Sequence, residues 1–472
     1  MSKNDLSQIP SRWETAVLSD VIEDLTSGFP CGDHNQEGRG TPHLRPMNIS
    51  EKGEIHLQKI KYIEEDDEKT LAKGDVLFNN TNSPKHLGKT AYIESDKKWH
   101  FSNHMTRIRV KENIISPKWL AKYLHHLLHR GFYRQHCRNH VNQASINQSF
   151  LLENIFVPLP PLTEQKHIVA KIDELFSKLD FGTTEINTAA QNLRHYKQSL
   201  LNSAMSGGIT KRWRQKNKIR SLDLDEYIKK VDYQCDDDLL NIPDEWRQIP
   251  IGSVSEVIPG NSPPSETYND SGKGIPLING PTEFGPHPFS ETKQTKFTTE
   301  PRKKCEEGDL LVCVRGNTTG RINIASSHVA IGRGVAAVRC HLNQNFLNYY
   351  LRSKQEYMLN KGTGTTYPSI SSKDIRRMPF PLAPPEEQAI IVEKLDRNFS
   401  IVEDIESNME VINKRSKHLR KSILKSAFQG ELLPKESHDE VDQLHIRSNQ
   451  SEDDNSKMEG QIKLTEVKVD DN

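Results

Sequence analysis

The chain carries one segment twice, and this repeat constrains the fold more than any other feature. Residues 158–165 read PLPPLTEQ, and residues 381–388 read PLAPPEEQ. The match continues at the same offset, so that SLLNSAMSG at 199–207 corresponds to SILKSAFQG at 422–430. A fixed offset leaves no insertion or deletion between the copies, which indicates a helical element whose length matters. A chain with two such halves can fold with an approximate internal two-fold axis.

The regions that precede the two copies also share a frame. Short anchors match in the same order in both halves: IPSRW at 9–13 and IPDEW at 242–246, TPHL at 41–44 and IPLI at 275–278, KGDVL at 73–77 and EGDLL at 307–311. Segments of dissimilar sequence and slightly different length join these anchors. A constant frame with variable filling is typical of a recognition module whose copies each read something different.

Length and composition exclude several classes of protein. The 472 residues suffice for about three domains. The formal net charge is zero, which argues against non-specific coating of nucleic acid but leaves room for local basic loops. The six cysteines include no C-x-x-C pair and are predicted to be reduced thiols. Residues 1–10 lack a signal-peptide core, and no run reaches the roughly eighteen apolar residues of a membrane helix, so we expect a cytoplasmic protein without a membrane partner.

Each half is predicted to contain an α+β module. Short β-branched runs bounded by Gly, Asn and Pro predict strands, for example at 90–93, 106–110 and 322–324. Residues 117–124 predict a helix with Pro117 in its first turn, and residues 343–351 predict its counterpart.

The repeated segments predict two long helices. From Ile168 onward, apolar or small residues recur at steps of three and four, with one gap at Gly182, which is the spacing of a heptad seam. The seam positions are Ile172, Leu175, Leu179, Ile186, Ala189, Leu193, Tyr196 and Leu200 in the first copy, and Ile391, Leu395, Asn398, Val402, Ile405, Met409, Ile412, Ser416, Leu419 and Ile423 in the second. Asn398 and Ser416 interrupt the seam, as polar residues that fix register do. Each helix would contain about 40–45 residues and extend roughly 60–65 Å.

These helices allow two arrangements. Each helix could pack on its own module, or the two could pair as an antiparallel coiled coil that separates the modules, and we favour the second. The expected organisation is a first module at 1–162, a first spacer helix at 163–207, a linker at 208–241, a second module at 242–384, a second spacer helix at 385–430 and a tail at 431–472. Gly207 is expected to cap the first helix, and the polar, acid-leaning tail is expected to be disordered.

No catalytic signature is visible, so we expect a chain that is not an enzyme and binds no cofactor or metal. A cluster of His125, His126, His129, His136, Cys137 and His140 lacks the H-E-x-x-H pattern and has no counterpart in the second half, so we interpret it as a solvated or base-stacking helix face. Gly362-Thr363-Gly364 lacks the continuation of a phosphate loop, and Ser262-Pro263-Pro264-Ser265 lacks both ends of an amino-methyltransferase motif. No nucleophile elbow or paired-carboxylate signature is present.

Two polar loops occupy equivalent places in the two halves. Residues 79–90 follow one predicted strand, and residues 315–321 follow its counterpart. Short polar side chains suit base edges, and Lys or Arg suits phosphates or guanine. The candidate DNA-binding residues are Thr81, Asn82, Ser83, Lys85, His86 and Lys89 in the first loop, and Arg315, Asn317, Thr318, Thr319 and Arg321 in the second. The alternative is that both are ordinary polar hairpin loops.

Taken with these loops, the frame resembles the DNA-specificity subunit of type I restriction–modification systems. The resemblance rests on 77–84, 88–90 and 145–148 in the first half, and on 260–265, 274–280 and 367–371 in the second. It covers about residues 9–430, and the paired proline–Glu-Gln helices are specific to that family.

The resemblance implies two target-recognition domains, each of which reads one half of a split, asymmetric site in double-stranded DNA. It also implies that the long helices serve as a spacer and as the docking surface for two modification subunits, which methylate adenine N6 with S-adenosylmethionine. Restriction subunits, which translocate and cleave DNA with ATP, would join that core, and this chain itself would carry no catalytic residue. The rival functions are a fused DNA methyltransferase or nuclease, and a coiled-coil scaffold without sequence preference.

Overall fold

The computed structural model describes residues 9–64, 67–141, 143–217, 228–232, 234–236, 239–362 and 368–433. The expectations for Thr363 and Gly364, for Tyr367 and for the tail beyond residue 433 therefore lie outside the described residues. The chain divides into two compact units, one formed by Met1–Ile186 with Val411–Asn472 and the other by Asn187–Glu410. Each unit contains one globular module and part of two 44-residue helices, α5 (Leu162–Met205) and α10 (Pro385–Phe428).

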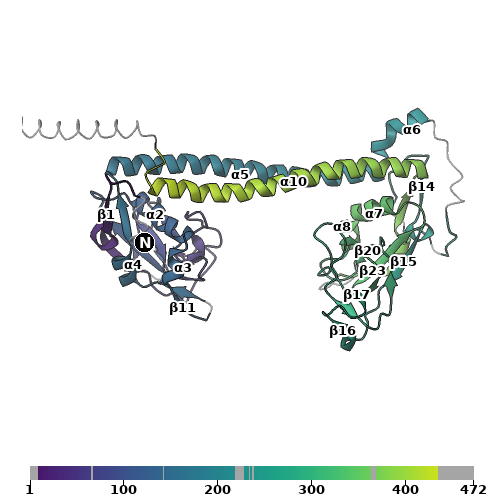
Figure 1. The fold of residues 1–472 in the computed structure, drawn as a ribbon, viewed down its shortest axis with the longest axis horizontal. Helices are drawn as coiled ribbons and strands as arrows, with labels where there is room; N and C mark the ends of the chain where they lie inside the picture. Colours follow the sequence, from purple (N-terminus) through teal and green to yellow (C-terminus); the bar gives the residue numbers. More distant parts are fainter. Residues whose placement is uncertain are drawn as a thin grey trace, which may run out of the picture. The chain divides into compact units, whose positions relative to one another are not determined.

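The module of unit 1 combines two four-stranded sheets with short helices (Figure 1). Its elements are β1 Glu14–Val17, α1 Leu18–Val21, β2 Ile22–Ser27, β3 Thr41–Leu44, η2 Pro46–Asn48, β4 Lys61–Ile63, β5 Thr70–Leu71, β6 Val76–Asn79, β7 Thr81–Asn82, β8 Thr90–Tyr92, β9 Trp99–Phe101, β10 Met105–Val110, α2 Pro117–His129, α3 Phe132–His136, β11 Arg138–Asn139, β12 Ala144–Ser145, α4 Gln148–Asn154 and β13 Phe156–Leu159. One sheet has the antiparallel order β2-β10-β6-β8, and the other has the order β4-β3-β9-β5 with β3 and β9 parallel. Strand β1 pairs with β13, and β7 joins a small sheet with β12 and β11.

The module of unit 2 repeats this topology. Its elements, with the segment that leads into it, are η3 Gly208–Thr210, α6 Lys211–Asn217, β14 Arg247–Pro250, η5 Ile251–Ser253, β15 Ser255–Pro259, η6 Ser265–Thr267, β16 Tyr268–Asn269, β17 Ile275–Ile278, β18 Phe297–Thr298, β19 Lys304–Cys305, β20 Leu310–Cys313, β21 Ile322–Ile324, β22 Val329–Ile331, β23 Val335–Cys340, α7 Gln344–Ser353, α8 Gln355–Lys361, α9 Ser372–Arg377 and β24 Pro379–Leu382. The sheet β15-β23-β20-β21 matches β2-β10-β6-β8, and the pair β14 with β24 matches β1 with β13. The parallel pair β17 with β22 matches β3 with β9. The α+β prediction for each module is thereby confirmed.

The repeated K/E-G-D anchor forms the same turn and ion pair in both modules. The backbone N–H of Ala72 donates to Asp75 at 2.8 Å, and the N–H of Glu306 donates to Asp309 at 2.8 Å. Each buried carboxylate also accepts from an arginine on the central strand, Arg109 or Arg339, whose Nε lies 2.8 Å away. A buried carboxylate needs such partners, which explains why the anchor recurs.

The proline–Glu-Gln anchor meets the Trp anchor in space. The Nε1 of Trp13 donates to Glu164 at 3.2 Å, and the Nε1 of Trp246 donates to Glu387 at 2.8 Å. The amide of the next residue, Gln165 or Gln388, donates to a backbone carbonyl before its own helix, at 2.9 or 2.8 Å. Two anchors far apart in sequence therefore form one joint between each module and the first turn of a long helix.

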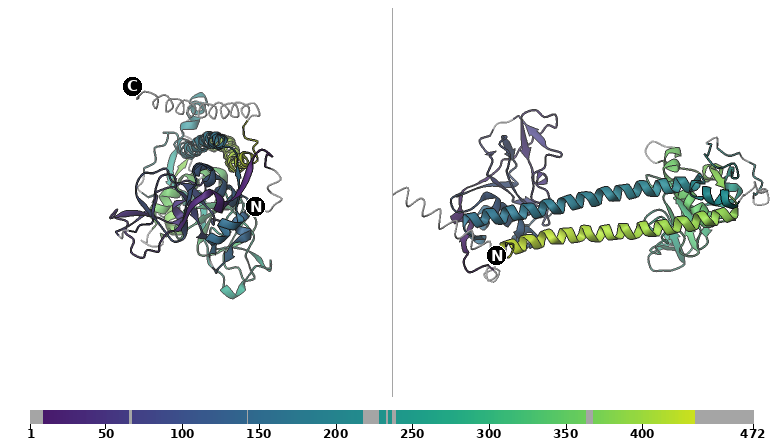
Figure 2. Two further views of the ribbon diagram at one scale, coloured as in Figure 1. Left: turned by 90° about the vertical axis from the view of Figure 1, so that its left-hand side faces the viewer. Right: turned by 90° about the horizontal axis from the view of Figure 1, so that it is seen from above.

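The long helices are antiparallel within each unit (Figures 1 and 2). In unit 1, Asp180 accepts from Arg420 at 2.5 Å, and Thr183 lies 3.4 Å from Ser416. In unit 2, Lys197 pairs with Glu406 at 2.7 Å, and Tyr196 donates to Asn398 at 3.1 Å. Asn398 and Ser416, which interrupt the apolar seam, are thus hydrogen-bonded across the pair. This confirms the favoured antiparallel arrangement over helices that pack only on their own modules.

The seam itself is discontinuous, which corrects the sequence prediction. Four predicted seam residues, namely Tyr196, Ile405, Ile412 and Leu419, are between 38% and 51% exposed. Buried apolar residues gather instead at the helix ends, for example Phe428 of α10, whose ring lies 4.7 Å from Trp119 in unit 1. The helix ends therefore pack on the module of their own unit, whereas these four seam residues stay exposed to solvent.

The linker prediction also needs correction at its start. The Lys- and Arg-rich stretch after Gly207 forms η3 and α6, and Arg214 of α6 is buried. Gly207 has a φ of 69° and Gly430 a φ of 70°, so both helices end in the left-handed turn expected from glycine. No helix in the described ranges is long and apolar enough to span a bilayer.

Candidate nucleic-acid interface

The first candidate loop is shaped by its own asparagines. Asn79 donates to the carbonyl of His86 at 3.2 Å, and Asn80 donates to Thr106 Oγ1 at 2.9 Å. Both asparagine side chains are buried, so they hold the loop and do not face solvent. Gly88 has a φ of +89°, and a Cβ there would lie 2.0 Å from the ring of Tyr133. The path of the loop from β6 to β8 is therefore tightly fixed.

The predicted residues of this loop differ in what they expose. Thr81, Asn82, Ser83, His86 and Lys89 are half-buried, whereas Lys85 is exposed. The ammonium of Lys89 donates to the carbonyl of Ile49 at 3.2 Å, and burial lowers the pKa of Lys89. Burial likewise lowers the pKa of His86 and favours its neutral form. Lys85 is the most exposed cation of this loop, and its Nζ lies 3.9 Å from the exposed carboxylate of Glu51.

Sequence reasoning missed a hairpin that adjoins this loop. Strand β12 pairs with β7, so that Ala144 opposes Asn82 and Ser145 opposes Thr81. The hairpin of β11 and β12 carries exposed polar and basic side chains, and Val141 near its tip is 98% exposed. The exposed cationic or titratable side chains on and before the hairpin are Arg134, His136, Arg138 and His140.

Local charge is the signal that could have revealed the hairpin. The sequence between Glu112 and Glu153 contains no Asp or Glu, although these two residue types make up 64 of the 472 residues. The second half has a matching acid-free stretch between Asp309 and Glu356. Zero net charge over the whole chain conceals these two regions, and each includes part of a candidate interface.

The histidine cluster does not form one solvated or base-stacking face, because its members on α2 are buried or half-buried whereas His136 and His140 are exposed. His125 and His126 are buried in the module, and His125 Nε2 lies 3.1 Å from the carbonyl of Glu51. Burial lowers the pKa of both histidines to about 3. Among the described residues, no three His, Cys, Asp or Glu side chains are grouped so that they could hold a metal ion.

The second candidate loop presents Arg315 and Asn317 to solvent. Thr319 is buried, and its hydroxyl donates to the carbonyls of Gly316 at 2.8 Å and Pro368 at 3.0 Å, so it holds the loop in place. Arg321 is half-buried and Nη2 lies 3.4 Å from the carbonyl of Gly285. Thr318 is half-buried. Arg315 is therefore the residue of this loop best placed to reach a ligand.

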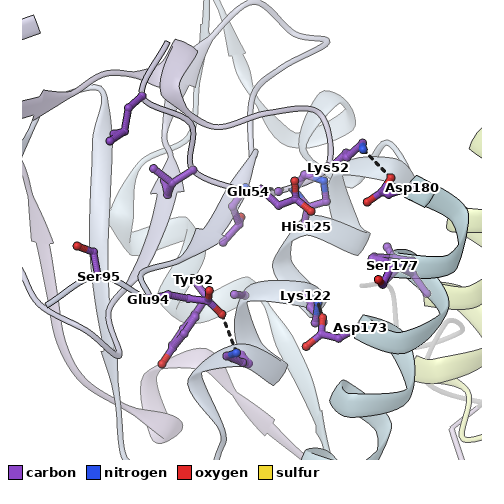
Figure 3. Close-up of a pocket in the computed structure, with 18 of the residues that line it drawn as sticks. Lys52, Glu54, Tyr92, Glu94, Ser95, Lys122, His125, Asp173, Ser177 and Asp180 are labelled. Carbon is purple, nitrogen blue, oxygen red and sulfur yellow. Dashed lines mark hydrogen bonds and ion pairs between the residues drawn. The ribbon is translucent and has the colours of Figure 1, made fainter. Parts of the chain in front are cut away.

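Unit 1 also contains a cleft of about 790 Å³ between the module and α5 (Figure 3). Three lysines line it, and each is paired with a carboxylate: Lys52 with Asp180 at 2.5 Å, Lys118 with Glu94 at 2.7 Å and Lys122 with Asp173 at 2.6 Å. Because these cations are already neutralised, the cleft is a weaker candidate for a phosphate backbone than the exposed loops.

Comparison with known proteins finds the same two-module frame. The family model described as "Type I restriction modification DNA specificity domain" matches residues 10–191 and 243–412. The chain is 31% identical over 440 residues to the type I restriction enzyme MjaX specificity subunit of Methanocaldococcus jannaschii, covering 89% of this chain and 95% of that one. It is 28% identical over 456 residues to the type I restriction enzyme EcoBI specificity subunit of Escherichia coli, covering 91% and 88%.

Solved structures share the fold. A chain from a structure of the type I R-M system aligns with a TM-score of 0.69 at 24% identity, covering 90% of this chain and 99% of that one. The HsdS subunit from Thermoanaerobacter tengcongensis aligns with a TM-score of 0.52 at 24% identity, covering 90% and 98%. Both matched regions of the family model contain a complete module frame and the start of a long helix. This chain belongs to the type I restriction–modification DNA specificity family.

Proposed function

We propose that this chain is the non-catalytic subunit that selects the DNA sequence for a type I restriction–modification complex, with each module reading one half of a split site in double-stranded DNA. The observation that carries the proposal is the placement of the two candidate loops. One connects β6 to β8 and the other connects β20 to β21, at the same position of the same sheet, yet their sequences differ. Two modules with the same sheet but different loop sequences are expected to bind two half-sites of different sequence.

The exposed side chains suggest how each module binds. Arg315 is exposed and has no hydrogen bond or ion pair from its side chain to any residue that the structure describes, so its guanidinium is available for a bidentate contact with guanine. Arg138 is exposed, and Lys85 is held only by a long, solvent-exposed ion pair with Glu51 at 3.9 Å, so both can bind phosphates, which fix position without reading sequence. The acid-free stretches contain the β11–β12 hairpin and the second candidate loop, and they lower the electrostatic cost of bringing a polyanion to these two places.

The long helices are proposed to bind two modification subunits, which methylate adenine N6, and the restriction subunits would join this core. Exposed apolar side chains on solvated helices support a docking surface of this kind. They are Phe181 and Tyr196 on α5 and Ile401, Ile405, Val411, Ile412 and Leu419 on α10. In this division of labour S-adenosylmethionine and ATP are used by the partner subunits.

The experiment is to map methylated adenines made by the chain with its modification subunits, using Arg315→Ala and a matched exposed control, Arg302→Ala. A bidentate base contact predicts that Arg315→Ala weakens binding by about 1–3 kcal/mol and relaxes the second half-site only. A phosphate contact predicts a similar loss on all sequences and a salt slope reduced by about one. If Arg315→Ala behaves like the control, this loop does not contact DNA.

A second test concerns the spacer role. Inserting four residues after Ala189 adds roughly 6 Å of helix and about one turn, so the gap between half-sites should lengthen by one or two base pairs at about 3.4 Å each. A two-residue insertion turns the seam by about 160° and should abolish assembly. An unchanged gap would mean that the helices serve only for docking.

The rival functions predict different results in these assays. A fused methyltransferase would transfer methyl groups without partner subunits, so the isolated chain is assayed with S-adenosylmethionine and DNA. A scaffold without sequence preference would produce methylation that no loop substitution redirects.

A further inference from the structure

The described residues of the linker that precedes the second module lie along that module. The N–H of Lys229 donates to the carbonyl of Ser253 at 2.9 Å, and the N–H of Leu240 donates to Gln248 Oε1 at 2.8 Å. Between these two points, the N–H of Asp236 donates to the carbonyl of Arg377 at 2.9 Å. The described linker residues are therefore attached to the module at three places.

Asp236 joins two short helices through one carboxylate. It forms ion pairs with Lys361, the last residue of α8, and with Arg377, the last residue of α9, whose Nε lies 3.3 Å away. The Asp236 side chain is 15% exposed, against 33% and 38% for its two partners. Salt and water screen such a shielded carboxylate less than they screen a surface ion pair, so its ion pairs contribute more to stability.

Residues 368–370, which precede α9, support the second candidate loop. The carbonyl of Pro368 accepts from the N–H of Gly316 at 2.8 Å and from the Thr319 hydroxyl at 3.0 Å. The N–H of Ile370 donates to the carbonyl of Val314 at 3.0 Å, and Ser369 forms a β-bridge with Arg315. A shift of residues 368–370 would therefore move the backbone of Arg315.

The first module holds its candidate loop by strand pairing. There β7 forms a two-residue ladder with β12, which is itself paired with β11. In the described part of the second module the corresponding contact is the single bridge between Arg315 and Ser369. The second loop thus depends more on what holds α9, the helix that follows residues 368–370.

We propose that Asp236 is a positioning residue for the second DNA-reading loop: by holding the last residue of α8 and the last residue of α9, the linker carboxylate fixes α9, the residues 368–370 that lead into it and with them Arg315. This inference rests on the proposed function, because it assigns Asp236 to the second half-site. Asp236 itself does not contact DNA.

The test compares Asp236→Asn with Asp232→Asn, an exposed linker residue with no ion pair among the described residues. Asn keeps the size and removes the charge. Amide exchange of Gly316 and Ile370 in the full chain should accelerate about tenfold in Asp236→Asn, the scale of one charge-assisted hydrogen bond. Asp236→Glu keeps the charge and should restore part of the protection from amide exchange. Lys361→Met removes only one of the two ion pairs and should also accelerate exchange.

The second measurement is DNA binding by the full chain with its modification subunits, with either half-site scrambled. Asp236→Asn should reduce discrimination at the second half-site by about tenfold and leave the first unchanged. Unchanged exchange, or faster exchange with full discrimination at both half-sites, overturns the proposal. If the unaltered protein discriminates at neither half-site, the proposed function has failed. Amide exchange is measured without DNA, so it still shows in that case whether Asp236 holds the loop.

Discussion

Replacing Glu387 by Gln should destabilise unit 2 far more than Glu164→Gln destabilises unit 1, although the two positions are equivalent in the repeat. The Glu387 side chain is fully buried and accepts from Arg214 at 2.5 Å, from Thr210 at 2.6 Å and from Trp246 at 2.8 Å. Its counterpart Glu164 pairs with Arg12 at 2.6 Å. The two sites differ mainly in where the arginine lies.

The expected magnitudes follow from that difference. Removing one partner of a buried ion pair costs about 3–5 kcal/mol, because the other charge stays buried without compensation. Arg214 is 9% exposed, and its Nε keeps Glu245 at 3.8 Å, so we expect the low end, about 3 kcal/mol. Arg12 is 41% exposed and can regain water, so Glu164→Gln should cost about 1 kcal/mol, the net value of a hydrogen bond.

The assay is amide exchange of the full chain at increasing denaturant, followed at 10–17 for unit 1 and 246–258 for unit 2. Each unit then serves as the reference for the other, which avoids assuming a single unfolding transition for a chain with two units. Adding Arg214→Met to Glu387→Gln should recover part of the loss, because the stranded charge is removed. Equal losses at the two sites, or no recovery in the double variant, would refute the reasoning.

Three further predictions concern the first module. Arg138→Ala should weaken binding to all DNA sequences alike and reduce the salt slope by about one, measured by titration at several salt concentrations; an effect confined to one sequence would contradict a phosphate contact. Gly88→Ala should abolish discrimination at the first half-site only, since its Cβ would lie 2.0 Å from Tyr133, whereas Gly38→Ala, also at a positive φ of 84° but with open space around it, should bind normally. Acid should unfold unit 1 before unit 2, because burial lowers the pKa of His125 and His126 to about 3 and that of His43 to about 4. The unfolded chain takes up these protons near pH 6.5, so below that pH the free energy of unfolding of unit 1 should fall by about 1.4 kcal/mol per histidine and pH unit. Unit 2 has no buried histidine among its described residues, so its free energy of unfolding should change less. Amide exchange between pH 7.5 and 5 measures both units, and equal acid sensitivity of the two would count against this prediction.

The sequence predicts the long helices well because their limits are local signals. Proline begins each repeat, glycine ends it, and the fixed offset gives both helices the same length, so the expected spans 163–207 and 385–430 differ from α5 and α10 by at most two residues at each end. Burial along those helices is not local. Ile412 and Leu419 fit a heptad seam, yet they are 47% and 51% exposed, because burial depends on which other parts of the chain pack there.

The candidate interface was less predictable for related reasons. Helical spacing cannot tell whether a face with His125 and His126 meets water or the module, and here it meets the module. Strand β11 consists of Arg138 and Asn139, which lack strand propensity, and its existence depends on pairing with β12. Within the second loop, composition cannot separate exposed Arg315 from buried Thr319, because that difference depends on the carbonyl of Pro368.

Both halves contain an ion pair between an arginine and the buried glutamate of the long helix, but the two arginines come from different places in the sequence. The anchor counterpart of Arg12 is Glu245, an acid that could not pair with the buried Glu387. Arg214 from α6 lies between these two carboxylates and supplies the cation that the anchor has lost. The joint of the second module therefore depends on α6 as well as on the matching anchor at 242–246. A module exchange cut at residue 242 would separate Arg214 from the glutamates with which it pairs, whereas a cut at Gly207 would keep the joint intact.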